Sequence, residues 1–167
     1  MAKKKINASD LISKIERLAK ARMASGEVVE LQNFRDLKNK AEPKTILVIE
    51  DDETMRAAMK KIFEMDGFIV RLAADGTELS MALDDTSPDL ILMDIGLPWL
   101  NGFELAQMLK EHKELKKIPL IFVSGKTSDE DIKRAFEIGA DDFIKKPFEI
   151  EKMKKTVNTL LKIAPGS

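Results

Sequence analysis

The chain has 167 residues and no cysteine, which excludes disulfides, thiolate metal sites and cysteine nucleophiles. Its 44% hydrophobic and 34% charged residues are typical of a globular protein, and no apolar run approaches the ~18 residues that a membrane span requires. The net charge of −1 hides an asymmetry, because residues 1–44 carry eleven Lys and Arg against six Asp and Glu, whereas residues 45–167 carry 17 against 23.

The basic first part of the chain favours two amphipathic helices. Residues 7–24 place apolar side chains on one side, Gly26 ends this segment, and residues 27–39 carry a second apolar stripe. We therefore expect a basic helical extension at 1–42 and a globular domain at 43–167. The extension is expected to pack as a hairpin on the domain or on its copy in a dimer, or to dock another protein.

The extension is not expected to bind a membrane or a nucleic acid. Its closely mixed charges exclude a signal peptide, so we expect a cytoplasmic protein with no membrane contact. It also lacks the pattern of a recognition helix, so nucleic-acid binding is not expected despite the excess of Lys and Arg.

From Thr45 onward, short apolar runs alternate with segments of helical periodicity. Such runs are typical of strands buried on both faces, and their alternation with helices predicts an α/β fold with a doubly wound, five-stranded parallel sheet. Five units are too few for a closed barrel of eight, so we expect the flavodoxin-like strand order 2-1-3-4-5. The expected strands are 45–49, 68–72, 89–93, 119–123 and 143–144, and the expected helices are 54–66, 76–84, 103–113, 129–138 and 149–161, with Met108 and Ile150 facing inward.

The stretch Pro88–Gly102 (PDLILMDIGLPWLNG) contains the most informative strand, which ends at a single acid, Asp94. A carboxylate at the end of a buried strand raises the free energy unless another group pairs with it. The loop after such a strand is also where open α/β sheets bind ligands. Asp94 is therefore the first candidate functional residue.

Polar residues also follow three other expected strands. Glu50 and Asp51 come after the first strand, Ser124 after the fourth and Lys146 after the fifth. The carboxyl ends of parallel strands lie on one edge of the sheet, and the first and third strands are neighbours in the expected order. We therefore expect these side chains to converge with Asp94 in one crevice.

The converging residues predict phosphoryl chemistry that depends on a metal ion. Three close carboxylates repel one another, and a hard divalent cation relieves the repulsion. Oxygen ligands without His or Cys favour Mg²⁺ over zinc, and Mg²⁺ leaves room for a phosphoryl group. Asp94 can then act as the nucleophile that forms an acyl phosphate, with the Lys146 ammonium and the Ser124 hydroxyl on the phosphoryl oxygens.

Four motifs carry a resemblance to a known family: ILVIEDD, PDLILMDIGLPWLNG, IPLIFVSG and GADDFIKKPF, each at a strand end and in this order. Through them, residues 45–162 resemble the receiver domain of bacterial two-component response regulators. The resemblance implies that a histidine kinase or a histidine phosphotransfer protein phosphorylates Asp94. It also implies that Glu50 and Asp51 hold Mg²⁺, with Asp51, Asp94 and the Gly96 carbonyl as direct ligands.

The resemblance further implies how the domain would switch. Ser124 is the switch hydroxyl, Lys146 the phosphate-sensing lysine and Phe143 the aromatic switch position, where Phe lacks the hydroxyl of the Tyr that many members carry. Switching would change the surface between Thr127 and Leu160, which contains the domain's fourth and fifth helices. That surface, or the N-terminal hairpin, is expected to bind a partner or a second copy; only Ala164–Ser167 follow the last helix, so no output domain is expected in this chain.

Three alternatives remain beside this interpretation. An aspartyl-phosphate phosphatase of the haloacid-dehalogenase type carries an acid two residues after its nucleophile, where this chain has Gly96. A flavodoxin-like cofactor binder needs a Ser-, Thr- and Gly-rich loop after the first strand, where Glu50 and Asp51 would repel a phosphate. A receiver could also act as a phosphate sink, or be degenerate. We expect self-phosphorylation and autodephosphorylation, without independent turnover of substrates.

Overall fold

The computed structural model of the chain describes residues 12–13, 15–17 and 42–163. The predicted helices at 7–24 and 27–39 lie outside the described residues, apart from short helical pieces at 12–13 and 15–17. Contacts between Cα atoms divide the chain into the units Met1–Pro43 and Lys44–Ser167, and the second unit contains the sheet. No helix within the described ranges has the length and hydrophobicity that crossing a membrane requires.

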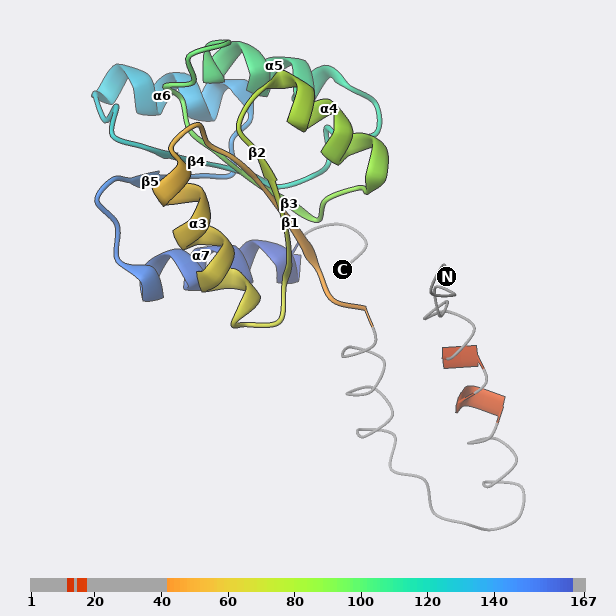
Figure 1. Cartoon of the computed structure of the whole chain (residues 1–167). Helices are drawn as coiled ribbons and strands as arrows, with labels where there is room; N and C mark the ends of the chain where they lie inside the picture. The colour runs from red at the N-terminus through yellow and green to blue at the C-terminus, as the bar shows by residue number, and fades with distance from the viewer. Residues whose placement is uncertain (1–11, 14, 18–41, 164–167) are drawn as a thin grey trace. The chain divides into compact units, whose positions relative to one another are not determined.

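The second unit alternates strands and helices along its whole length, as the sequence predicts. Helix labels follow Figure 1 and begin at α3. The elements are β1 Thr45–Ile49, α3 Glu53–Glu64, β2 Ile69–Ala73, α4 Gly76–Asp85, β3 Leu90–Met93, α5 Gly102–Glu111, β4 Leu120–Ser124, α6 Asp129–Ile138, β5 Asp142–Lys145 and α7 Ile150–Ile163.

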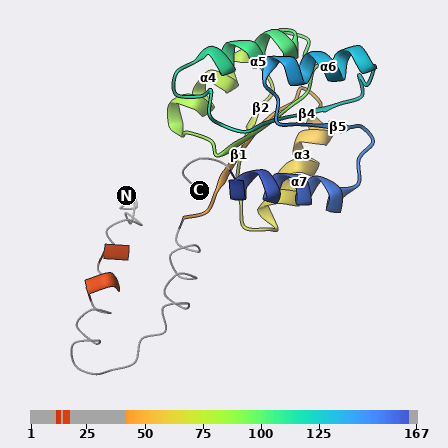
Figure 2. The same cartoon turned by 180° about the vertical axis from the view of Figure 1, so that it is seen from behind.

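The five strands form one parallel sheet in the order β2-β1-β3-β4-β5, which confirms the predicted flavodoxin-like topology. Helices α4, α5 and α6 cover one face of the sheet, and α3 and α7 cover the other (Figures 1 and 2). The sheet is therefore doubly wound, and β1 and β3 are neighbours at the point where the strand order reverses. This is the edge where the sequence places the candidate site.

Side chains of the central strands alternate between the two cores. In β1, Leu47 and Ile49 pack under α4 and α5, while Ile46 and Val48 pack against α3 and α7. All four of these side chains are fully buried. A strand buried on both faces cannot shift its register without exposing one apolar set, so the residues that follow β1 have a fixed position.

Four helices begin at side chains that accept hydrogen bonds from their first turns. Asp52 begins α3, Asp75 begins α4, Asn101 begins α5 and Ser128 begins α6. Each cap satisfies a backbone N–H that has no partner inside the helix. The caps therefore set where each helix starts after the polar edge of the sheet.

Two side chains that the sequence places in the core are exposed. Met108 is 61% exposed, because the buried stripe of α5 runs through Leu105, Ala106 and Leu109 and leaves Met108 on the next row. Ile150 is 47% exposed, because it is the first residue of α7, one turn before the buried Met153.

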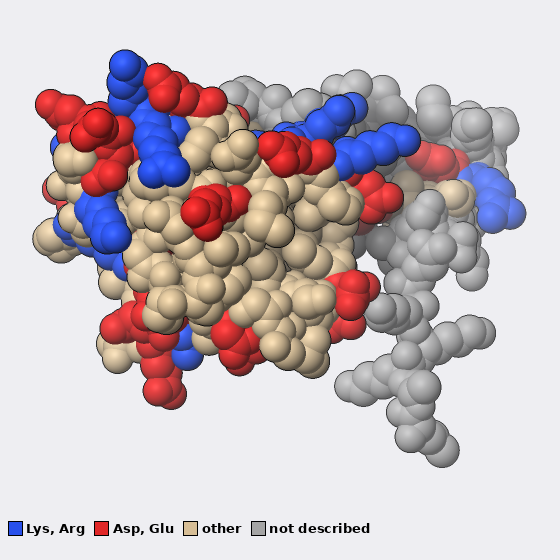
Figure 3. Space-filling view, turned by 90° about the horizontal axis from the view of Figure 1, so that it is seen from above, with Lys and Arg blue, Asp and Glu red and all other residues tan. Residues whose placement is uncertain are grey.

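The outward face of the α4–α5–α6 layer carries few charges at its centre (Figure 3).

Candidate functional site

The backbone at the end of β1 fixes the positions of Glu50 and Asp51. The N–H of Glu50 donates to the carbonyl of Ala73 at 3.1 Å, so pairing with β2 continues one residue past the strand. The Glu50 side chain is only 2% exposed, and the Asp51 side chain faces solvent. The acidic pair thus offers one buried and one exposed carboxylate.

Asp94 follows β3 directly and lies beside this pair. Its N–H donates to the carbonyl of Ile49 at 3.0 Å, which extends the pairing of β3 with β1. Its carboxylate oxygen Oδ1 accepts from the N–H of Gly96 at 3.1 Å. The carboxylate is partly exposed, so one side of it remains accessible from solvent.

Lys146 brings a positive charge from the far side of the sheet. Its ammonium Nζ donates to Glu50 Oε2 at 2.7 Å and to Asp94 Oδ2 at 3.3 Å. Its backbone N–H donates to the carbonyl of Ser124 at 2.9 Å, which fixes the start of the β5–α7 loop on β4. One ammonium therefore joins the ends of β1, β3 and β5.

Burial and charge shift the pKa values of this ion pair. Burial raises the pKa of Glu50 above its ordinary 4.5, although the hydrogen bonds from Lys146 and from the N–H of Asp52 act in the opposite direction. Burial alone would lower the pKa of Lys146, but its hydrogen bond to Glu50 and the negative charge of Asp94 outweigh burial and raise it. The charged ammonium is thus stable in the folded chain.

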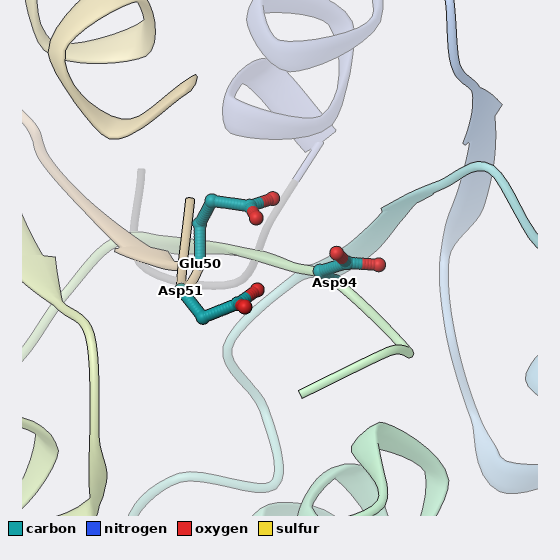
Figure 4. Close-up of side chains that lie close together, drawn as sticks. All are labelled: Glu50, Asp51 and Asp94. Atoms are coloured by element: carbon teal, nitrogen blue, oxygen red, sulfur yellow. The ribbon is translucent and has the colours of Figure 1, made fainter. Parts of the chain in front are cut away.

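The three carboxylates are arranged as a cation site. One carboxylate oxygen each of Glu50, Asp51 and Asp94 lies within 4.8 Å of the other two, and Figure 4 shows the Glu50 and Asp51 side chains extending toward Asp94. The donor set consists of hard oxygens without His or Cys, which matches Mg²⁺ and not zinc. The residues present therefore fit a magnesium ion.

Ser124 and Phe143 lie near this edge without a hydrogen bond to Asp94. Ser124 is the last residue of β4, and its buried Oγ accepts from the N–H of Lys126 at 3.2 Å. The Phe143 ring lies on β5, half-buried, with its centroid 6.3 Å from that of Phe122. The polar centre of the site thus consists of Glu50, Asp51, Asp94 and Lys146.

Sequence reasoning missed Arg56. The Nη1 of this residue donates to the carbonyl of Glu50 at 2.9 Å and to that of Asp51 at 2.6 Å. The available signal was an arginine in the first turn of the helix that follows the acidic pair. A side chain at that position can reach back to the loop before the helix.

Two residues fix the loop that follows Asp94. The indole Nε1 of Trp99 donates to the carbonyl of Ala74 at 3.0 Å, which ties this loop to the start of α4. At Gly102, a Cβ atom would lie 2.5 Å from the carbonyl oxygen of Asp94 and 2.6 Å from the Cα of Ile95. Only glycine allows this close approach of α5 to the Asp94 backbone.

A hollow of about 430 Å³ opens beside the same loop. Its lining includes Gly96, Trp99, Glu104 and Lys126. A Cβ on Gly96 would meet nothing closer than the Lys126 Cε at 3.8 Å. The space beside Gly96, where a Cβ would lie 4.0 Å from Asp94 Oδ1, is therefore open.

Comparisons with known proteins agree with this geometry. The sequence model of the response regulator receiver domain matches residues 46–158. The aerobic respiration control protein ArcA of Escherichia coli K12 is 38% identical over 116 residues, which cover 70% of this chain and 48% of ArcA. The chain thus spans about half the length of the curated relatives it matches.

Solved structures give the same result. The signal receiver domain of a histidine kinase from Syntrophus aciditrophicus is 33% identical, with a TM-score of 0.67 over 74% of this chain and 94% of that one. The receiver domain of the sensor histidine kinase PA1611 of Pseudomonas aeruginosa has magnesium coordinated in its active-site cleft. At 22% identity and a TM-score of 0.65, over 72% of this chain and 99% of that one, it shares the fold.

Proposed function

Because this chain belongs to the response regulator receiver domain family, we propose that it accepts a phosphoryl group on Asp94 with Mg²⁺ held by the adjacent acids. The observation that carries the proposal is the Lys146 ammonium, which contacts both Glu50 and Asp94 next to the three clustered carboxylates. Family membership also favours this role over the aspartyl-phosphate phosphatase and the flavodoxin-like cofactor binder.

Asp94 suits the role of acceptor better than its two neighbours. Glu50 is buried and bonded to Lys146 at 2.7 Å, so its oxygens are engaged. Asp51 faces solvent, but the hydrogen bonds of the Lys146 ammonium go to Glu50 and Asp94 instead of to Asp51. Only Asp94 combines a partly exposed carboxylate, a nearby cation and the open space beside Gly96.

The transfer forms one bond and breaks one bond. A carboxylate oxygen of Asp94 attacks the phosphorus, the bond between phosphorus and the donor's histidine nitrogen breaks, and its electron pair leaves with the imidazole. Asp51, Asp94 and the Gly96 carbonyl would hold Mg²⁺ directly, with Glu50 beside them. When bound, Mg²⁺ would neutralise negative charge on the phosphoryl oxygens. Lys146 lies at the same carboxylate and supplies a second positive charge.

Phosphorylation would change the binding properties of another surface. We propose that the Ser124 hydroxyl turns from the Lys126 N–H to a phosphoryl oxygen and that the Phe143 ring turns inward, acting through packing alone. The affected surface contains α6, β5 and α7, where a partner or a second copy would bind. A receiver that changes no partner would instead act as a phosphate sink.

The proposed donor is a histidine kinase or a histidine phosphotransfer protein, and the proposed compartment is the cytoplasm. The division into an extension at 1–42 and a receiver at 43–167 is also part of the proposal. The extension is a candidate for dimerisation or docking. Comparing the oligomeric state of the full chain with that of residues 43–167, before and after phosphorylation, tests this assignment.

The decisive experiment measures the intact mass after incubation with Mg²⁺ and a small acyl phosphate. We expect the wild type to gain one phosphoryl group and Asp94→Asn to gain none. Asp85→Asn, which changes an exposed acid at the end of α4, is the matched control and should gain one. Equal labelling of Asp94→Asn and the wild type would overturn Asp94 as the acceptor.

A further inference from the structure

Arg56 connects the start of α3 with the two acids that precede it. It lies in the first turn of the helix, and its Nη1 bonds to the carbonyls of Glu50 and Asp51. Its side chain is half-buried, and the bond to the Glu50 carbonyl is partly shielded from water, whereas the bond to the Asp51 carbonyl is exposed. One charged nitrogen therefore holds two successive peptide groups.

Those two carbonyls lie in a gap between regular elements. The β1 ladder ends near Glu50, whose N–H still pairs with Ala73, and the α3 ladder begins at the carbonyl of Asp52. Within residues 42–163 we find no donor other than Arg56 for the carbonyls of Glu50 and Asp51. The orientation of the peptide between the two acids therefore depends on this arginine.

The loop and the helix form one connected unit. Asp52 Oδ1 accepts from the N–H of Met55 at 2.7 Å, and the N–H of Asp52 donates to Glu50 Oε1 at 3.2 Å. Arg56 closes this network from the other side through the backbone. The direction in which the Glu50 and Asp51 side chains leave the chain is set by these bonds.

We propose that Arg56 is a positioning residue for the magnesium site, which holds the carboxylates of Glu50 and Asp51 in the direction of Asp94. This inference rests on the proposed function, because it concerns the same metal. The hydrogen bonds of the Arg56 side chain go to backbone carbonyls and not to the three carboxylates. It acts through the backbone of two residues that would hold the ion.

Charge and position predict opposite results when Arg56 is removed. As a cation beside three carboxylates, Arg56 opposes the binding of another cation, so its charge alone predicts that removal tightens Mg²⁺ binding. As a positioning residue, it keeps two ligands in place, and loss of such support typically weakens metal binding by about 10- to 100-fold. The sign of the change therefore separates the two effects.

The test measures Mg²⁺ affinity in the full-length chain, from the fluorescence of Trp99 and from the shift of the thermal unfolding midpoint with added Mg²⁺. We expect Arg56→Met to bind Mg²⁺ about tenfold more weakly than the wild type. Arg56→Lys keeps the charge but loses the planar donor group, so we expect an intermediate affinity. Lys61→Met removes the same charge from an exposed position on α3 and should bind at least as tightly as the wild type.

Each outcome bears on the inference. Unchanged or tighter binding by Arg56→Met would overturn it, even if that variant were less stable without Mg²⁺, because a merely structural bond lowers stability and leaves the affinity alone. If Arg56→Met does not fold, Arg56→Lys decides, and an affinity equal to the wild type would overturn the role. A wild type that binds no Mg²⁺ would overturn the metal part of the proposed function and this role with it.

Discussion

The two segments that carry the clustered carboxylates are held in different ways. The segment from Glu50 to Arg56 is held by charges and hydrogen bonds, among them the contacts of Lys146 and Arg56. The segment from Asp94 to Gly102 is held by packing and by neutral hydrogen bonds, with Ile95 and Leu97 buried and Gly102 against the Asp94 backbone. Binding of an ion or a phosphoryl group changes charge, so the first segment can respond while the second keeps Asp94 in place.

The largest effect is expected from a substitution that disrupts the packing of the segment from Asp94 to Gly102. Gly102→Ala places a Cβ 2.5 Å from a backbone oxygen, so α5 or the acceptor loop must move. We expect the free energy of unfolding to fall by about 3 kcal/mol in urea titrations. Gly125→Ala is the control, because a Cβ there meets nothing within 4 Å. Equal stability of the two variants would contradict the packing argument.

The second largest effect is expected from removal of the ion pair between Lys146 and Glu50. Lys146→Met leaves Glu50 buried without its ammonium, and we expect a loss of about 2 kcal/mol at neutral pH without Mg²⁺. The loss should shrink as the pH falls from neutral through the raised pKa of Glu50, because a protonated Glu50 carries no charge that the ammonium would balance. Lys145→Met changes the exposed neighbour and should cost little. Urea titrations at several pH values measure this loss. A loss of unfolding free energy that does not change with pH would mean that the aliphatic part of Lys146 stabilises the fold only by packing.

A smaller effect is expected from removal of the hydrogen bond that Trp99 donates to Ala74. Trp99→Phe keeps an aromatic ring against Gly76 but removes the hydrogen bond to the carbonyl of Ala74. We expect a loss of about 1 kcal/mol in urea unfolding followed by circular dichroism. Trp99→Leu, which also removes the ring, should cost more. If the two variants lost the same stability, the hydrogen bond would account for the whole effect.

The smallest effect concerns the pH dependence that Glu50 confers. Its pKa is raised mainly by burial, so above pH 4.5 the folded chain keeps a proton that the unfolded chain has released. Without Mg²⁺, the unfolding free energy of the wild type relative to Glu50→Gln should therefore fall as the pH rises from 4.5 through the raised pKa. Glu114→Gln controls for the loss of one exposed carboxylate. A difference that rises with pH would contradict the assignment.

The strand order and the five polar residues at the strand ends could be predicted from sequence, because apolar runs and the polar residues that follow them are local features. Arg56 could not, since its function depends on two carbonyls whose partners are known only after folding. Met108 was misplaced because apolar character does not tell a buried helix row from its neighbour. The contact of Trp99 with Ala74 joins two loops 25 residues apart, which no local pattern encodes.

The bond between Lys146 and Glu50 joins residues 96 positions apart in the chain. Closing so long a loop costs entropy that only the finished sheet offsets, so we expect this contact to form late in folding. A nascent chain that ends before β5 has its acidic cluster but lacks the ammonium that balances it. If Asp94 is the acceptor, as proposed, a chain that ends before β5 should therefore take up no phosphoryl group, which couples this activity to completion of the domain.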